Sequence, residues 1–66
     1  MTVRMLKRMN KELRDLQSNI KKLEAFIDTV TFHNMEAPAQ LLLRNQYRAI
    51  LDYEHYLGKR IDYYQR

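Results

Sequence analysis

The sequence contains no cysteine, one glycine, one proline and a single serine, Ser18. Without cysteine, neither a disulfide nor a thiolate metal site can stabilise the fold. His33 and His55 are too far apart in sequence to form a helical ligand pair, so we expect no metal and no cofactor. A single glycine excludes a glycine-rich phosphate loop. No histidine lies near Ser18 in sequence, so we do not expect an enzyme.

The chain also lacks a long hydrophobic run. No apolar stretch approaches the roughly 20 residues that a membrane-spanning helix needs. The basic start, MTVRMLKRMNKEL, has neither the apolar centre nor the cleavage site of a signal peptide. We therefore expect a cytoplasmic protein without a membrane partner, and the absence of cysteine fits a reducing compartment.

A length of 66 residues corresponds to one small unit. A domain of about this size buries only about 60% of the surface that its unfolded chain exposes, so its core is marginal. Small folds compensate with disulfides, a metal or self-association. Because the first two are excluded, we expect a homo-oligomer.

Hydrophobic residues in the first half of the chain alternate steps of three and four, the a/d spacing of a coiled coil. They are Leu6, Met9, Leu13, Leu16, Ile20, Leu23, Ile27 and Val30. This spacing predicts a helix over about residues 2–29, with Thr2 as its N-cap. The β-branched residues 29–31 and Pro38 predict a turn at about residues 30–36, followed by a second helix over about residues 37–64.

The second helix carries two stripes at coiled-coil spacing. The first stripe consists of Leu43, Tyr47, Ile50, Glu54, Leu57, Ile61 and Tyr64. The second, called the outer stripe below, consists of Leu42, Gln46, Ala49, Tyr53, Tyr56, Arg60 and Tyr63. One stripe packs on the first helix, so the other must face another subunit, a ligand or both. The predicted fold is all-α: residues 1–66 form one antiparallel two-helix hairpin that assembles into a homo-oligomer.

Charge is distributed unevenly along the chain, whose net charge is +4. Residues 1–22 carry seven basic and two acidic groups, residues 23–43 carry three acidic groups, and residues 44–66 carry five basic and three acidic groups. A hairpin brings the two basic segments together at its open end. We expect that end to attract anions and the turn end to repel them.

Five tyrosines fall within the last twenty residues, interleaved with arginines. A tyrosine ring offers a face on which a nucleobase stacks, and arginine pairs with phosphate. Tyrosine and arginine are also enriched in subunit interfaces. Spacing alone leaves both interpretations open.

The stretch from Arg8 to Arg60 resembles a family of very small bacteriophage proteins. The residues that carry the resemblance are Glu12, Leu16, Ile20, Leu23, Phe26, Ile27, Phe32, Leu42, Leu43, Gln46, Tyr53, Arg60 and Ile61. That family is similar to the helical-hairpin sponges with which phages defeat cyclic-nucleotide immunity, such as CBASS. The resemblance implies a compact oligomer, in the cytoplasm of the infected bacterium, that traps cyclic di- or trinucleotides between subunits and degrades nothing.

The predicted ligand site lies at the open end. If the turn is near residue 33, residues facing each other across the hairpin sum to about 67, which places Arg8 near Arg60 and Glu12 near Tyr56. The expected roles are a stacking ring, phosphate-binding guanidiniums and groups that read a base edge. We expect Tyr53 or Tyr56 to supply the stacking ring and Arg8 and Arg60 to supply the guanidiniums. Gln46 or Glu12 would read the base edge.

Two other classes of binding protein remain as alternatives. One is a nucleic-acid-binding or scaffolding module, although the basic groups are not arrayed along one recognition helix. The other is an inhibitor that caps a host protein with its outer stripe. Steep salt dependence with duplex DNA, and no binding of cyclic dinucleotides, would favour the first. A poorly folded or weakly associated isolated chain would favour the second.

Overall fold

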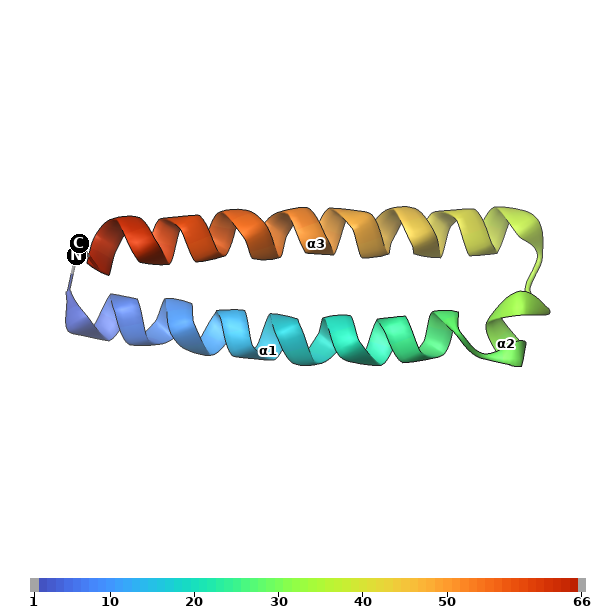
Figure 1. Cartoon of the computed structure of the whole chain (residues 1–66), viewed down its shortest axis with the longest axis horizontal. Coiled ribbons are helices and arrows are strands. Elements are labelled where there is room, and N and C mark those ends of the chain that lie inside the picture. Colours follow the sequence, from blue (N-terminus) through green and yellow to red (C-terminus); the bar gives the residue numbers. More distant parts are fainter. Residues whose placement is uncertain (1, 66) are drawn as a thin grey trace.

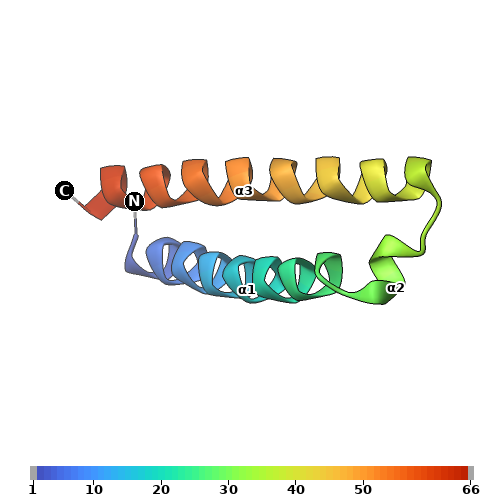
Figure 2. The same cartoon turned by 45° about the vertical axis from the view of Figure 1, so that its right-hand side comes forward.

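The computed structural model describes residues 2–65, which form two long helices joined by a short one. Helix α1 spans Val3–Ile27, α2 spans Val30–His33 and α3 spans Ala37–Gln65. Helices α1 and α3 run antiparallel and side by side, with α2 at the turn (Figures 1 and 2). The result is a rod of 47 × 15 × 13 Å. The all-α prediction is confirmed, and residues 2–65 contain no strand.

Helix α1 begins at the predicted cap. The Thr2 side chain accepts a hydrogen bond of 3.2 Å from the backbone N–H of Met5, which satisfies one of the free donors of the first turn. At the other end, the backbone N–H of Asp28 donates to the Glu24 carbonyl at 3.2 Å and that of Thr29 donates to the Phe26 carbonyl at 3.0 Å, which closes the last turn.

The predicted turn at residues 30–36 contains a short helix, α2, that the sequence did not predict. The β-branched residues were expected to disfavour helix, but Thr29 caps this single turn by accepting a 3.2 Å hydrogen bond from the N–H of Phe32. The Thr29 hydroxyl also donates to the Phe26 carbonyl at 2.6 Å. The Phe32 ring is fully buried and meets Phe26 edge-on at 6.1 Å. Capping and aromatic burial therefore outweigh the weak helix propensity of the β-branched residues.

The hydrophobic core is small. Its central cluster consists of Met9, Leu57 and Ile61, with Leu6, Leu13 and Leu16 packed against it. The predicted seam of α1 is thus the packed face, except that Val30 is 74% exposed. Only five hydrophobic residues between positions 2 and 65 are buried, which is little for a fold without disulfides.

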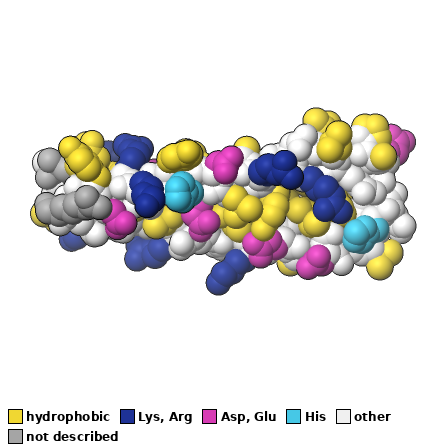
Figure 3. Space-filling view, turned by 45° about the horizontal axis from the view of Figure 1, so that its top comes forward, with side chains coloured by type: hydrophobic (Ala, Val, Ile, Leu, Met, Phe, Trp, Pro, Cys, Tyr) yellow, Lys and Arg dark blue, Asp and Glu magenta, His cyan; other side chains and the backbone are white. Residues whose placement is uncertain are grey.

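Most of the apolar surface of the outer stripe of α3 stays exposed, although Tyr53 hydrogen-bonds Glu12 of α1. Leu42 is 71% exposed, Tyr56 66% and Tyr63 69%. Hydrophobic side chains are spread along the surface from the open end to the turn end (Figure 3). Among residues 2–65, no helix is both long and apolar enough to cross a membrane.

Candidate functional site: a basic groove at the open end

A groove of about 540 Å³ lies between the first half of α1 and the end of α3. Its lining residues are Met5, Arg8, Met9, Lys11, Glu12, Asp15 and Arg60. Six of them come from α1 at helical spacing, and Arg60 comes from the outer stripe of α3. Three cationic and two anionic side chains line the groove, above a floor of methionine. Its volume falls within the range of small-molecule sites.

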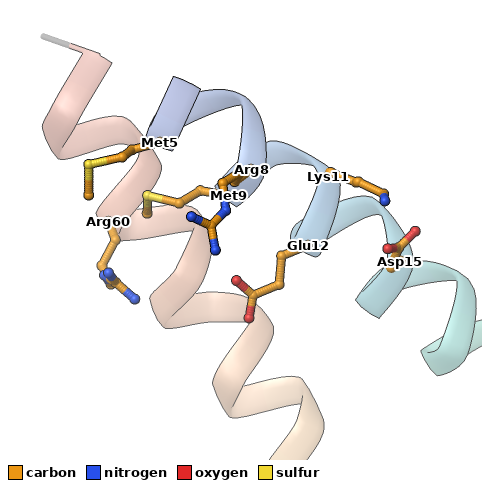
Figure 4. A pocket seen from close by; sticks show the side chains of 7 residues that line it. All are labelled: Met5, Arg8, Met9, Lys11, Glu12, Asp15 and Arg60. Carbon is orange, nitrogen blue, oxygen red and sulfur yellow. The ribbon is translucent and has the colours of Figure 1, made fainter. Parts of the chain in front are cut away.

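Three of the predicted site residues converge on this groove. Arg8 and Glu12 are one turn apart on α1 and extend toward α3, and Arg60 of α3 completes the lining (Figure 4). Lys11 and Asp15 extend away from α3 and form the outer rim (Figure 4). The helix pairing that follows from the hairpin therefore places two guanidiniums and a carboxylate around one space.

Tyr53, a fourth predicted residue, lies beside the groove and is hydrogen-bonded to one of its lining residues. Its hydroxyl donates to the carboxylate of Glu12 across the hairpin. This bond, together with partial desolvation, raises the pKa of Tyr53, whereas the charge of Arg60 lowers it. The Tyr53 side chain is still 49% exposed, so ring surface remains open to a ligand. Glu12 thus pairs with Tyr53 rather than with Tyr56, one helical turn further on.

The remaining two predicted residues lie elsewhere in a single chain. Tyr56 is exposed and its ring meets that of His55 edge-on at 5.2 Å. Gln46 is exposed and precedes Arg60 by fourteen residues of α3. At 1.5 Å per residue, that separation is about 21 Å along the helix. One hairpin therefore does not bring Gln46 to the groove.

The N-terminal part of α1 forms a basic surface that adjoins the groove. A concavity of about 520 Å³ is lined by Val3, Arg4, Lys7, Arg8, Lys11 and Arg14. Arg8 and Lys11 line both concavities, so the two lie next to each other on α1. Lys11 was not predicted from the sequence as a site residue. Its position one turn after Lys7 places both lysines on the same face of the helix and could have indicated it. Residues 2–65 contain no group of three or more acidic, histidine or cysteine side chains suited to a metal.

These features suit noncovalent capture of an organic anion. The guanidiniums of Arg8 and Arg60 can donate paired hydrogen bonds to phosphate, and the exposed Tyr53 face can stack a base. The Glu12 carboxylate can accept a hydrogen bond from an N–H of a base edge. Its negative charge repels a phosphate placed directly beside it.

Fold and groove together define a small helical-hairpin protein with a basic, aromatic binding surface. The chain belongs to the Sequestin family, whose profile matches residues 4–63. Membership confirms the resemblance to sequestering proteins, and it implies a binding role rather than catalysis. No curated protein and no solved structure matches the chain.

Proposed function

We propose that this Sequestin-family protein binds and sequesters cyclic oligonucleotide second messengers, above all cyclic dinucleotides, without degrading them. By lowering the free concentration of such a messenger, it would protect a phage from nucleotide-based immunity in the cytoplasm of the infected bacterium. The working form is a homo-oligomer.

The observation that carries the proposal is the convergence of Arg8, Arg60 and Glu12 at one groove, with Tyr53 hydrogen-bonded to Glu12 beside it. A cyclic dinucleotide presents two phosphates and two bases in a compact ring. Two guanidiniums match the phosphates, a tyrosine face matches a base, and a carboxylate matches the N–H groups of a base edge. The family name, which denotes sequestration, supports a sequestering role.

The residue types at the groove support sequestration without turnover. Its lining offers no serine, cysteine or histidine to act as a nucleophile. The two carboxylates, Glu12 and Asp15, are adjacent on one helix, and Figure 4 shows them extending in different directions. They are therefore not disposed as an acid–base pair about one bond.

The test is calorimetry and thermal shift with a panel of cyclic dinucleotides, cyclic trinucleotides and ADP-ribose-type signals. We expect at least one cyclic dinucleotide to bind, to raise the melting temperature by linkage and to be recovered intact after heat denaturation. Absence of heat and of thermal shift across the panel would refute the proposal. Recovery of a hydrolysed product would show that the protein is an enzyme.

The basic surface of α1 favours a second candidate, binding to nucleic acid. Five basic side chains, Arg4, Lys7, Arg8, Lys11 and Arg14, line its concavity. Contacts of this kind with duplex phosphates would give an affinity that falls steeply with salt, whatever the base sequence. A titration with a short DNA duplex at several salt concentrations separates this candidate from nucleotide sequestration.

A further inference from the structure

Glu12 places a negative charge in a groove that otherwise suits anions. Of the two acidic residues that line the groove, Asp15 extends away from α3, whereas Glu12 extends toward α3 on the same side as Arg8 (Figure 4). The Glu12 carboxylate therefore repels the phosphates that the guanidiniums of Arg8 and Arg60 attract. Its presence favours binding only if the ligand also donates hydrogen bonds to it.

Tyr53 holds this carboxylate in place. The Tyr53 hydroxyl donates to the Oε1 atom of Glu12 and so joins α3 to α1. A carboxylate has about four lone-pair sites, so this bond leaves most of its accepting capacity free. The bond also raises the pKa of Tyr53, which keeps the phenol protonated as the donor at neutral pH. Both side chains are exposed, so a ligand can reach them.

The Glu12 carboxylate accepts hydrogen bonds and cannot donate them. The phosphates of a cyclic dinucleotide also only accept, so its donors come from the bases or from the ribose hydroxyls. Guanine carries two neighbouring donors on its pairing edge, the N1–H and the exocyclic amino group, which together match the two oxygens of a carboxylate. Adenine carries an unprotonated N1 at the same place, and a carboxylate repels the lone pair of that atom. The chemistry of Glu12 therefore favours guanine over adenine.

The ring of Tyr53 can orient the same base. The phenol oxygen lies in the plane of the ring and is bonded to Glu12, so a base stacked on the ring face has one edge beside the carboxylate. The side chain is 49% exposed, which leaves ring surface for such stacking. Arg8 and Arg60 remain available for the phosphates.

We infer that Glu12 is the specificity-determining residue of the groove and that it selects cyclic dinucleotides containing guanine over those containing only adenine. Tyr53 is the positioning residue, because its hydroxyl fixes the carboxylate that reads the base. The inference rests on the proposed function and goes beyond it, since sequestration as such requires no choice between bases.

Calorimetry with cyclic dinucleotides that differ only in their bases tests the selection. Cyclic di-GMP and the mixed cyclic GMP–AMP both supply the guanine that one Glu12 requires, so both should bind more tightly than cyclic di-AMP. Since the difference includes at least one hydrogen bond to a charged group, we expect a ratio of about tenfold or more. Equal affinities, or a preference for adenine, would overturn the inference and leave the proposed function intact. Absence of binding by all three would refute both.

Two analogues of cyclic di-GMP separate the base from the sugar. Cyclic di-IMP lacks the exocyclic amino group but keeps the N1–H, so its affinity should lie between those of cyclic di-GMP and cyclic di-AMP. The deoxyribose analogue keeps both base donors and should bind about as well as cyclic di-GMP. If the deoxyribose analogue lost affinity and cyclic di-IMP did not, Glu12 would bind a ribose hydroxyl, and the inference would be wrong.

Substitution of Glu12 tests the residue itself. Glu12→Gln replaces the carboxylate with an amide of the same shape, which both donates and accepts. The readout is the ratio of the affinities for cyclic di-GMP and cyclic di-AMP, because loss of the charge acts on both ligands alike. We expect this ratio to fall toward one. Asp15→Asn is the matched control, since it removes a charge from the outer rim and should leave the ratio unchanged.

Tyr53→Phe tests the positioning role. The variant keeps the stacking ring but releases the carboxylate, so the ratio should fall while both ligands still bind. Circular dichroism checks that the three variants remain helical. An unchanged ratio in folded Glu12→Gln, or an equal fall in Asp15→Asn, would overturn the inference. If Glu12→Gln does not fold, the ligand series with the unmodified protein still decides.

Discussion

The Tyr47 hydroxyl donates a 2.5 Å hydrogen bond to the Glu24 carboxylate, joining α3 to α1 in the half of the rod nearer the turn. Tyr53 and Glu12 form the equivalent bond nearer the open end. In both pairs the tyrosine comes from α3 and the glutamate from α1. The two bonds fix the relative rotation of the long helices, because a tyrosine on another face of α3 would not reach the same carboxylate.

These bonds predict a loss of stability at high pH. The hydrogen bond to Glu24 is the main cause that raises the pKa of Tyr47 above its ordinary value of 10.0, and Glu12 acts likewise on Tyr53. A raised pKa means that the folded state favours the protonated phenol, so its contribution is complete below pH 10.0 and disappears as the pH rises through the folded-state value. Denaturant unfolding as a function of pH measures the loss.

Tyr47→Phe with Tyr53→Phe is the matched control for that titration. The double variant keeps both rings but has no phenol to ionise at either position. We expect it to lose less stability than the wild type as the pH is raised above 10.0. An equal loss in both proteins would show that neither bond contributes to the pH dependence.

Substitution in the seam should abolish folding. Ile20 is 5% exposed, so Ile20→Asp places an unpaired charge in an apolar contact and exceeds the stability of so small a core. Lys21 is the next residue but lies on the exposed side, so Lys21→Glu should leave the helical circular dichroism unchanged. If both changes were equally damaging, the assigned packing face of α1 would be wrong.

The aromatic core at the turn should be as sensitive as the central cluster. Phe32→Ala removes a fully buried ring and the support for the Arg44 guanidinium, which lies 5.1 Å from the ring centroid. We expect a loss of about 3–5 kcal/mol in the free energy of unfolding, enough to unfold much of the protein. The nearby Val30→Ala is the control, because Val30 is exposed. A chemical denaturation series measures both.

Binding should depend on the groove and not on charge alone. Arg60→Ala removes a phosphate partner and Tyr53→Ala a stacking face, each weakening cyclic dinucleotide binding by about 1–3 kcal/mol. Lys59→Ala deletes the same charge one residue away, outside the groove lining, and should have a much smaller effect. Calorimetry should be preceded by a check of assembly, because Arg60 and Tyr53 also belong to the outer stripe. Equal effects of Arg60→Ala and Lys59→Ala would mean that binding depends on overall positive charge and not on the groove.

Self-association should be visible without ligand. The exposed outer stripe and the small core predict a particle larger than the 8.1 kDa chain at micromolar concentration by light scattering. Helicity should also fall on dilution, since assembly and folding are linked. A stable monomer with undiminished helicity would contradict this prediction.

The sequence was most informative where geometry leaves few choices. Steps of three and four residues place Ile20, Leu57 and Ile61 on packed faces of antiparallel helices, and the structure buries all three. The turn was harder to predict, because the helical turn at Phe32 depends on burial of a ring that local propensity does not register. The Glu12–Tyr53 bond was missed for a related reason. Pairing by residue number locates backbones, whereas a long side chain reaches one turn to either side.

The turn also sets the direction in which the hairpin can form. Phe26, Phe32 and Arg44 are close in sequence, so bringing them together closes a short loop, whereas joining Met9 to Ile61 closes a loop of about fifty residues. Folding should therefore start at the α2 turn, and the pairing of α1 with α3 should extend from there toward the open end. The binding groove is then the last part to form. Changes at Phe32 should slow folding, while changes at Ile61 should mainly speed unfolding.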